Sequence, residues 1–413
     1  LDWLFANATA QQRVDAAFFG GSNVAFNKFD VNTDGAISKE DPRVVDTYIG
    51  NDYTDLDDQL NAVIGLNRTM DDPRKVTLSL VDVELTDDKV ITFAADFKLV
   101  RDYTIRRSNL INGDVNFDGA VTTADIDVVA ANYGSNGKWS EGNVSALIVG
   151  DANFNQVTSA DIAAIASTWL GAKPALGSYV GAFGDEVRRL FRDGTTGTQT
   201  KLNLAIGSST ADWTNAASWY GGVVPNTTDA VVGLLSQDTT ATTVNVDANV
   251  TVGAINVDTY SPYTLGGTGS IAFASAGTQA TEINVFTGTL NVNVATTGTA
   301  TVNGEAGTTI NFNGAGIDHG IGKLLADNVS VGAGSKTTLA ENGADANTSV
   351  VNSLGIAGTT GAWTSALDLN DNDLVIQAGT AVASAFANVY DQVKSGFGFG
   401  LYDGTTGIIS TTA

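Results

Sequence analysis

Acidic and amide side chains recur at a fixed spacing in this chain. Between Asp114 and Asp125 they occupy positions 1, 3, 5 and 12 of a twelve-residue loop, with Gly119 at position 6. Carboxylate and amide oxygens at such positions can point inward around a hard cation, while the glycine allows a sharp bend and residue 7 offers its carbonyl. The spacing therefore predicts a loop that coordinates Ca²⁺ through oxygen.

The same pattern occurs three times. The predicted ligands of the loop above are Asp114, Asn116, Asp118, Ala120 through its carbonyl, and Asp125. An upstream loop keeps the full spacing with Asp30, Asn32, Asp34, Ala36 and Asp41. A downstream loop has Asp151, Asn153, Asn155 and Asp161. It is one residue short, because the glycine expected after Asn155 is missing and Gln156 follows directly, so we expect weaker or distorted binding there. The alternative for a single copy is an acidic turn with no metal bound, and the repetition of the pattern favours calcium.

A fourth, degraded copy is one of two interpretations of residues 81–103. Ile91, Thr92 and Asp96 match the places of Val121, Thr122 and Asp125 in the full loop. The alternative is a plain β-hairpin, in which residues 90–97 form a strand that pairs with residues 76–85. The pattern alone leaves both open.

Short helices are expected after the loops. An apolar stripe that includes Ile126 and Val129 predicts a helix over residues 124–133. Pro42 is tolerated in a first helical turn, where its missing N–H would have no partner, so a second helix is expected to begin near Asp41. With the predicted strands, this makes residues 1–111 an α+β region.

The loop motif, followed by a single helix, resembles the dockerin type I repeat of secreted bacterial proteins. The resemblance covers residues 30–50 and 112–171 and includes the spacer Gly-x-Trp-x-x-Gly-Asn at residues 137–143. It implies EF-hand-like loops that fold with calcium, and in cellulosomal relatives it implies docking onto a cohesin partner.

Composition limits the classes of partner. The chain has 413 residues and a net charge of -24, so phosphate backbones would be repelled and nucleic acid is excluded as a partner. It has no cysteine, and no apolar run approaches the ~20 residues of a membrane helix. Acidic calcium loops and few lysines fit a protein of the cell surface or the extracellular space, where calcium is abundant.

From Leu202 onward, Thr, Asn, Gly, Val and Ala dominate, and short strands such as residues 250–257 follow one another. This pattern predicts an all-β domain, for which a parallel β-helix is favoured and a β-sandwich is the alternative. The chain is therefore expected to be multidomain. The predicted limits are 1–111, a repeat pair at 112–172, a helical connector at 173–201, the β domain at 202–380, and a helix with a Gly-rich tail at 381–413.

The beginning of the β domain resembles extracellular bacterial β-repeat proteins, some of them autotransporter-like. The resemblance rests on Trp213, Trp219, Gly221, Gly222 and Pro225. Residues 367–413 resemble the closing segment of such proteins, where a last strand leads into a helix. This resemblance implies an extracellular location more than an activity.

A catalytic site is not expected. His319 is the one histidine, and with Asp318 and Lys323 it could form a catalytic cluster, although a polar turn between rungs is the simpler interpretation. We therefore expect a non-enzymatic, secreted, calcium-binding structural protein that self-assembles into a polymer or a surface layer. One alternative is a polysaccharide-binding or polysaccharide-degrading protein with an exposed aromatic row, whose candidates are Trp213, Trp219, Tyr220, Tyr260, Tyr263 and Trp363. Another is an adaptor that binds a cohesin-like partner.

Overall fold

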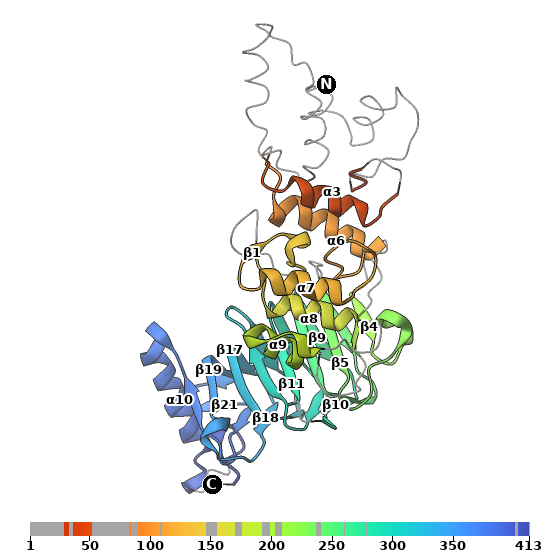
Figure 1. The fold of residues 1–413 in the computed structure, drawn as a ribbon. Helices are drawn as coiled ribbons and strands as arrows, with labels where there is room; N and C mark the ends of the chain where they lie inside the picture. Colours follow the sequence, from red (N-terminus) through yellow and green to blue (C-terminus); the bar gives the residue numbers. More distant parts are fainter. Residues whose placement is uncertain are drawn as a thin grey trace, which may run out of the picture. The chain divides into compact units, whose positions relative to one another are not determined.

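A computed structural model of the chain describes residues 29–32, 36–51, 83, 90–107, 110–145, 155–169, 176–191, 199–202, 209–236, 241–259, 261–277, 280–400 and 404–412. The chain divides into two compact units (Figure 1). The first comprises residues 1–144 and 148–161, and the second comprises residues 145–147 and 162–413. The structure thus groups the expected first region with most of the repeat pair, and the helical connector with the β domain.

The first unit contains the predicted short helices. Its elements are α3 (Glu40–Tyr48), η1 (Phe93–Phe97), α6 (Lys98–Arg107), α7 (Thr123–Asn132), β1 (Asn136–Gly137), η2 (Trp139–Glu141), β2 (Asn155–Gln156) and the start of α8 (Ser159–Thr168). The hairpin alternative for residues 90–97 is wrong, because η1 is a π-helical turn that continues into α6. Its proposed partner strand lies outside the described residues, except for Val83.

Two backbone pairings in the first unit have the same form. Ile91 exchanges hydrogen bonds with the segment after α3, accepting from the Gly50 N–H at 2.8 Å and donating to Asn51 at 2.9 Å. Val157 does the same after α7, accepting from Gly134 and donating to Ser135, both at 2.9 Å. Each pairing joins the end of one repeat to the start of another. The described repeats therefore form two pairs, residues 30–51 with 90–107 and residues 114–135 with 155–168, and the last repeat continues into the second unit from residue 162.

Aromatic side chains fill the core of this unit around Trp139. Its ring lies 5.7 Å from that of Phe97 and 6.1 Å from that of Phe117. The guanidinium of Arg101 lies over the indole, 5.7 Å from the ring centroid. Trp139 comes from the spacer after α7, Phe97 from η1 and Phe117 from the loop before α7, so burial of the indole joins both repeat pairs.

The second unit is a β-solenoid of about six turns built from parallel strands, and the β-sandwich alternative is excluded. A 13-stranded sheet supplies two of its three faces. The first face contains β3 (Gln199–Lys201), β5 (Val231–Ser236), β8 (Ala254–Thr259), β11 (Glu282–Val285), β14 (Thr301–Gly304), the first parts of β17 (Lys323–Val331) and β19 (Ser349–Ile356), and β23 (Leu374–Ile376). The second face contains β4 (Thr210–Asp212), β6 (Thr242–Asn245), β9 (Tyr263–Gly266), β12 (Thr289–Val292), β15 (Thr309–Phe312) and the second parts of β17 and β19.

A seven-stranded sheet forms the third face. Its strands are β7 (Asn249–Val252), β10 (Ser270–Phe273), β13 (Ala295–Thr297), β16 (Asp318–Ile321), β18 (Lys336–Leu339), β22 (Ala366–Asp368) and β24 (Gly407–Ile409). The single strand expected over residues 250–257 is wrong, because the chain turns at Gly253 from β7 on the third face to β8 on the first. An apolar run cannot by itself reveal a corner between two faces.

Alternation places apolar side chains inside the solenoid. In β12, β15 and β18, inward residues are buried and their neighbours are half-exposed. Stacked amides run outside: Asn311 Nδ2 donates to Asn291 Oδ1 at 2.8 Å, and Asn291 Nδ2 donates to Thr264 Oγ1 at 3.2 Å. Parallel register places identical residue types side by side, so the Asn and Thr side chains satisfy one another along the stack.

Helices and short turns complete the second unit. They are η3 (Leu176–Ser178), α9 (Gly181–Leu190), η4 (Ala216–Ser218), η5 (Tyr220–Gly222), η6 (Asp345–Asn347), η7 (Gly379–Ala381), α10 (Val382–Gly396) and η8 (Gly398–Gly400), with a small hairpin of β20 (Gly358–Thr359) and β21 (Ala362–Trp363). Near β4, Trp219 Nε1 donates to the Trp213 carbonyl at 2.5 Å and both indoles are buried. At the other end, α10 packs against β24. Within the described residues, no helix is long and apolar enough to cross a bilayer.

Candidate metal centre

The loop from Asp114 to Asp125 is closed by hydrogen bonds to its own first residue. The Asp114 carboxylate accepts from the Asp118 N–H at 3.0 Å and from the Gly119 N–H at 2.8 Å. Gly119 adopts a φ of 94°, a conformation that only glycine takes without strain. This bend brings positions 1 and 5 to the same side of the loop. Asn116 and Asp118 are exposed, whereas Asp114 is buried.

Asp125 ties the end of the loop to the start of α7. Its carboxylate accepts from the Val115 N–H at 2.8 Å and from the Thr122 N–H at 2.7 Å. Thr122 in turn caps the helix by accepting from Ala124 at 3.2 Å, which completes a capping box. The last predicted ligand therefore stabilises both the helix start and the loop closure.

The carboxyl groups of this loop are buried close to one another, which makes their ionised forms less favourable. Burial raises the pKa of Asp114 to about 6, and the nearby charges of Asp125 and Asp118 raise it further. Burial also raises the pKa of Asp125, although three backbone N–H groups oppose that shift. A bound cation would remove this repulsion, because it favours the charged form of every carboxylate around it.

Two residues outside the predicted ligand set support the loop. Trp139 Nε1 donates to the carbonyl of Asp114 at 2.7 Å. The Lys39 ammonium, from the upstream loop, donates to the carbonyl of Phe117. No local sequence pattern indicates the role of Lys39, since its contact spans 78 residues. Trp139 lies in the spacer that the dockerin resemblance includes. The resemblance was therefore the sequence feature that pointed to Trp139.

The upstream loop has the same closing contacts. Asp41 is buried and accepts from the Ser38 N–H at 2.8 Å and from the Asn32 N–H at 3.3 Å. Burial raises the pKa of Asp41 to about 6, and the charge of Asp30 contributes to that rise. Asp30 and Asp41 therefore lie close enough for their charges to interact. Asn32 and Ala36 lie in this loop as well, whereas Asp34 is outside the described residues.

Only the second half of the downstream loop is described. Asp161 is buried and accepts from the Thr158 N–H at 2.7 Å, as Asp125 does from Thr122. Its other partner is the Val144 N–H at 2.6 Å, which precedes the loop. Asn155 is buried in β2, and Asp151 and Asn153 lie outside the described residues.

The fourth copy shares the closing contacts. Asp96 accepts from the N–H groups of Val83 and Thr92, each at 2.8 Å, and Thr92 accepts from the Ala95 N–H at 3.0 Å. If Asp96 is position 12, then position 1 is Leu85, which has no side-chain oxygen. This copy therefore keeps the closing aspartate, while residues 84–89 lie outside the described residues.

The donor chemistry of the full loops fits calcium, since every predicted ligand is an oxygen. In the described part of the chain, no group of three or more His, Cys, Asp or Glu side chains is gathered closely enough to hold a metal. The predicted ligands of each loop include an asparagine amide and a backbone carbonyl. A group defined by His, Cys, Asp and Glu side chains alone does not count these two ligands. If calcium binds, Asp114, Asn116, Asp118, Ala120 and Asp125 would hold it, and the ion would fix the loop against α7.

No family model, curated protein or solved structure matches this chain.

The alternative catalytic cluster is not assembled in the solenoid. His319 is buried inside, where its Nε2 lies 2.9 Å from the Asn313 carbonyl and its ring lies 5.3 Å from that of Phe312. Asp318 points outward and accepts from Thr338 Oγ1 at 3.0 Å. Neighbouring residues of a strand point to opposite faces, so these two side chains cannot act on one substrate.

Proposed function

We propose that this protein is a secreted, calcium-binding structural protein of a bacterial cell surface, extracellular matrix or fibre, and that it self-assembles. Calcium would fix the loops of the first unit, while the solenoid would supply a long, stacked surface. The protein would act through shape and contact and would not catalyse a reaction.

The calcium part is supported by one repeated arrangement. Asp41, Asp125, Asp161 and Asp96 each accept from the backbone N–H of the Ser or Thr three or four residues before them. In the two full loops this aspartate lies near a second buried carboxylate, Asp30 or Asp114. Buried carboxylates that repel one another at the end of a glycine-bent loop are the expected state of a calcium loop before the ion binds.

Binding of sugar rings to an aromatic row is less favoured. Trp213, Trp219 and Tyr263 are at most 1% exposed and belong to the solenoid core. The indole N–H groups of both tryptophans donate to backbone carbonyls. Three of the six candidate aromatics therefore have no face to offer a polysaccharide.

The test is calcium titration of the whole chain by calorimetry. We expect wild-type protein to bind in the full loops, and Asp114→Ala to abolish the contribution of its loop. Asp127→Ala is the matched control, since Asp127 is an exposed aspartate of α7 outside the ligand positions. Equal binding by wild type and Asp114→Ala, or no binding in millimolar calcium, would contradict the proposal.

Electron microscopy with and without a chelator tests self-assembly. We expect polymers that depend on calcium, because net negative charge on each copy opposes association until cations reduce it. Monodisperse protein that degrades a polysaccharide would favour the glycan alternative. A tight one-to-one complex with a cohesin would favour the adaptor alternative.

A further inference from the structure

The outer surface of the first face of the solenoid changes from polar to apolar along its length. One outward column of register partners consists of Asn256, Asn284, Asn303, Leu325, Val350 and Val375. At Asn284 a helix covers this column, because Arg189 of α9 donates to Asn284 Oδ1 at 3.0 Å and to Glu282 at 2.9 Å. Beyond Asn303 the column is apolar, and Val375 at its end is 45% exposed. The apolar part thus continues a surface that already accepts a helix.

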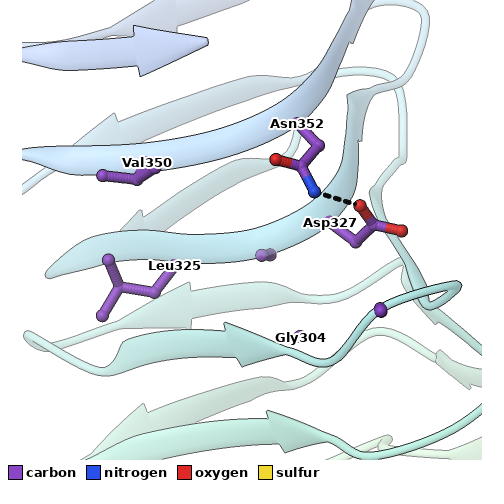
Figure 2. A pocket seen from close by; sticks show the side chains of 7 residues that line it. Gly304, Leu325, Asp327, Val350 and Asn352 are labelled. Atoms are coloured by element: carbon purple, nitrogen blue, oxygen red, sulfur yellow. Dashed lines mark hydrogen bonds between the residues drawn. The ribbon is translucent and has the colours of Figure 1, made fainter. Parts of the chain in front are cut away.

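A shallow hollow of about 300 Å³ lies on this apolar part. Figure 2 shows Leu325 and Val350 side by side on neighbouring strands, with Gly304 on the next strand. Gly304 and Ala306 also line the hollow. Its rim is polar, because the Asp327 carboxylate accepts from Asn352 Nδ2 at 2.6 Å and from the Gly307 N–H at 2.7 Å.

A second apolar surface is exposed on α10. Val382, Phe386 and Tyr390, spaced four residues apart, are 64%, 71% and 66% exposed, and the last two rings are 6.4 Å apart. Val389 and Val393 of this helix pack on the end of the solenoid core. Val382 and Phe386 line a groove between α10 and the same end of the solenoid, yet both side chains stay more than 60% exposed. Large side chains exposed in one line mark a contact surface.

The hollow carries one acidic charge, and α10 carries one exposed basic charge. Asp327 is the one charged residue among those that line the hollow. Hydrogen bonds from Asn352 and Gly307 lower the pKa of Asp327, so it stays ionised. In α10 the charged residues are Asp391 and Lys394, and Asp391 is engaged by Trp363 Nε1 at 2.8 Å. Lys394 is exposed one turn beyond Tyr390.

We propose that α10 of a second copy of this chain docks in the hollow, with Phe386 on Leu325 and Val350, and Lys394 beside Asp327. The contact joins two different patches of one chain, so repetition links copies into a row or a closed ring. The inference rests on the proposed self-assembling function and names its contact surface.

Because the chain has no cysteine, paired single-cysteine variants can test the contact. Val350→Cys and Phe386→Cys proteins, carrying tags of different mass, are mixed under mild oxidation. We expect the disulfide-linked heterodimer to exceed the product of a Val350→Cys and Thr297→Cys mixture by about tenfold or more, because docking raises the effective concentration. Thr297 is the matched control, since it is exposed on the third face.

Charge exchange tests the orientation. Lys394→Glu, introduced into the Phe386→Cys protein, should reduce cross-linking to Val350→Cys severalfold. Asp327→Lys, introduced into the Val350→Cys partner, should restore it, because the pair is reformed with opposite signs. A structural defect in either helix or strand would not be repaired by the second substitution.

Two results would overturn the docking contact. One is heterodimer no more abundant than with Thr297→Cys, and the other is Phe386→Cys linked mainly to itself, which would indicate a symmetric helix pair. Calcium titration and microscopy of wild-type protein are run beside these samples. If polymers form with calcium but the cross-link is absent, only the docking contact is refuted. If the cross-link forms but the protein binds no calcium, only the proposed calcium binding is refuted.

Discussion

At the residue scale, single aspartates connect loop closure, helix capping and the predicted calcium coordination. Asp125 serves the first two, because its two oxygens accept from both ends of the loop. It is also the last of the predicted ligands. Its counterpart Asp96 accepts from Thr92 in the same way. The capping function of this aspartate is therefore expected to persist without a bound metal.

Asp125→Ala should weaken the first unit even without calcium. The change leaves the N–H groups of Val115 and Thr122 without their acceptor, which we expect to cost about 1–3 kcal/mol in unfolding free energy. Urea unfolding in excess chelator measures this loss. Asp127→Ala, on the exposed side of the same helix, should stay within about 0.5 kcal/mol of wild type. Equal effects of both substitutions would contradict the structural role.

His319 should make the solenoid less stable in mild acid. Burial lowers the pKa of His319 below its usual 6.5, although the Asn313 carbonyl and the charge of Asp318 oppose the shift. The unfolded chain therefore takes up a proton first, and stability falls as pH drops below 6.5. Unfolding of wild type and His319→Gln between pH 7.5 and 5 measures this. A slope that is identical in both proteins would refute the prediction.

At the element scale, close packing of helices on the first face depends on small residues. Gly233 of β5 lies against Ser167 of α8, and a Cβ at this glycine would overlap the serine side chain. On the same face, Arg189 of α9 reaches the partly buried Glu282 and the buried Asn284. The position of α8 thus depends on a steric contact, and that of α9 depends on a polar contact.

Gly233→Val should destabilise the second unit by about 1–3 kcal/mol, because the added side chain must displace α8. Thermal or urea unfolding of this unit measures the change. Gly177→Ala is the matched control, since a Cβ there meets open space. A Gly233→Val protein as stable as wild type would mean that α8 does not pack on β5 in solution.

At the scale of the whole molecule, the two compact units differ in what stabilises them. The first depends on short helices and acidic loops, while the second depends on a continuous apolar core through its stacked turns. The boundary falls within α8, between Asp161 and Ile162. A ligand that binds only the first unit should therefore change the stability of that unit alone.

Calorimetry should resolve two unfolding transitions, of which calcium shifts only one. Free calcium at 100 times the dissociation constant should add about 2.7 kcal/mol to the first unit, with no direct effect on the solenoid. Chelation should reverse that shift. Asp114→Ala identifies which transition belongs to the first unit. Two transitions that move together would show that the units unfold as one.

The sequence by itself determined the local features. Loop spacing placed Asp30, Asp114 and their partners at turns that the structure closes by backbone hydrogen bonds, and alternation predicted the parallel β-helix. These features depend on residues close together in the chain, where side-chain period and turn chemistry are sufficient. The residue 90–97 hairpin failed because Ile91, Thr92 and Asp96 suit either a strand or a capped helical turn.

Only the tertiary structure decided which distant residues meet. The contact of Lys39 with Phe117, the matching pairings of Ile91 and Val157, and the burial of His319 all depend on packing between separate segments. The corner at Gly253 and the apolar column ending at Val375 likewise depend on how turns stack. Sequence pattern fixes which face of a strand is apolar, whereas folding decides whether that face is covered.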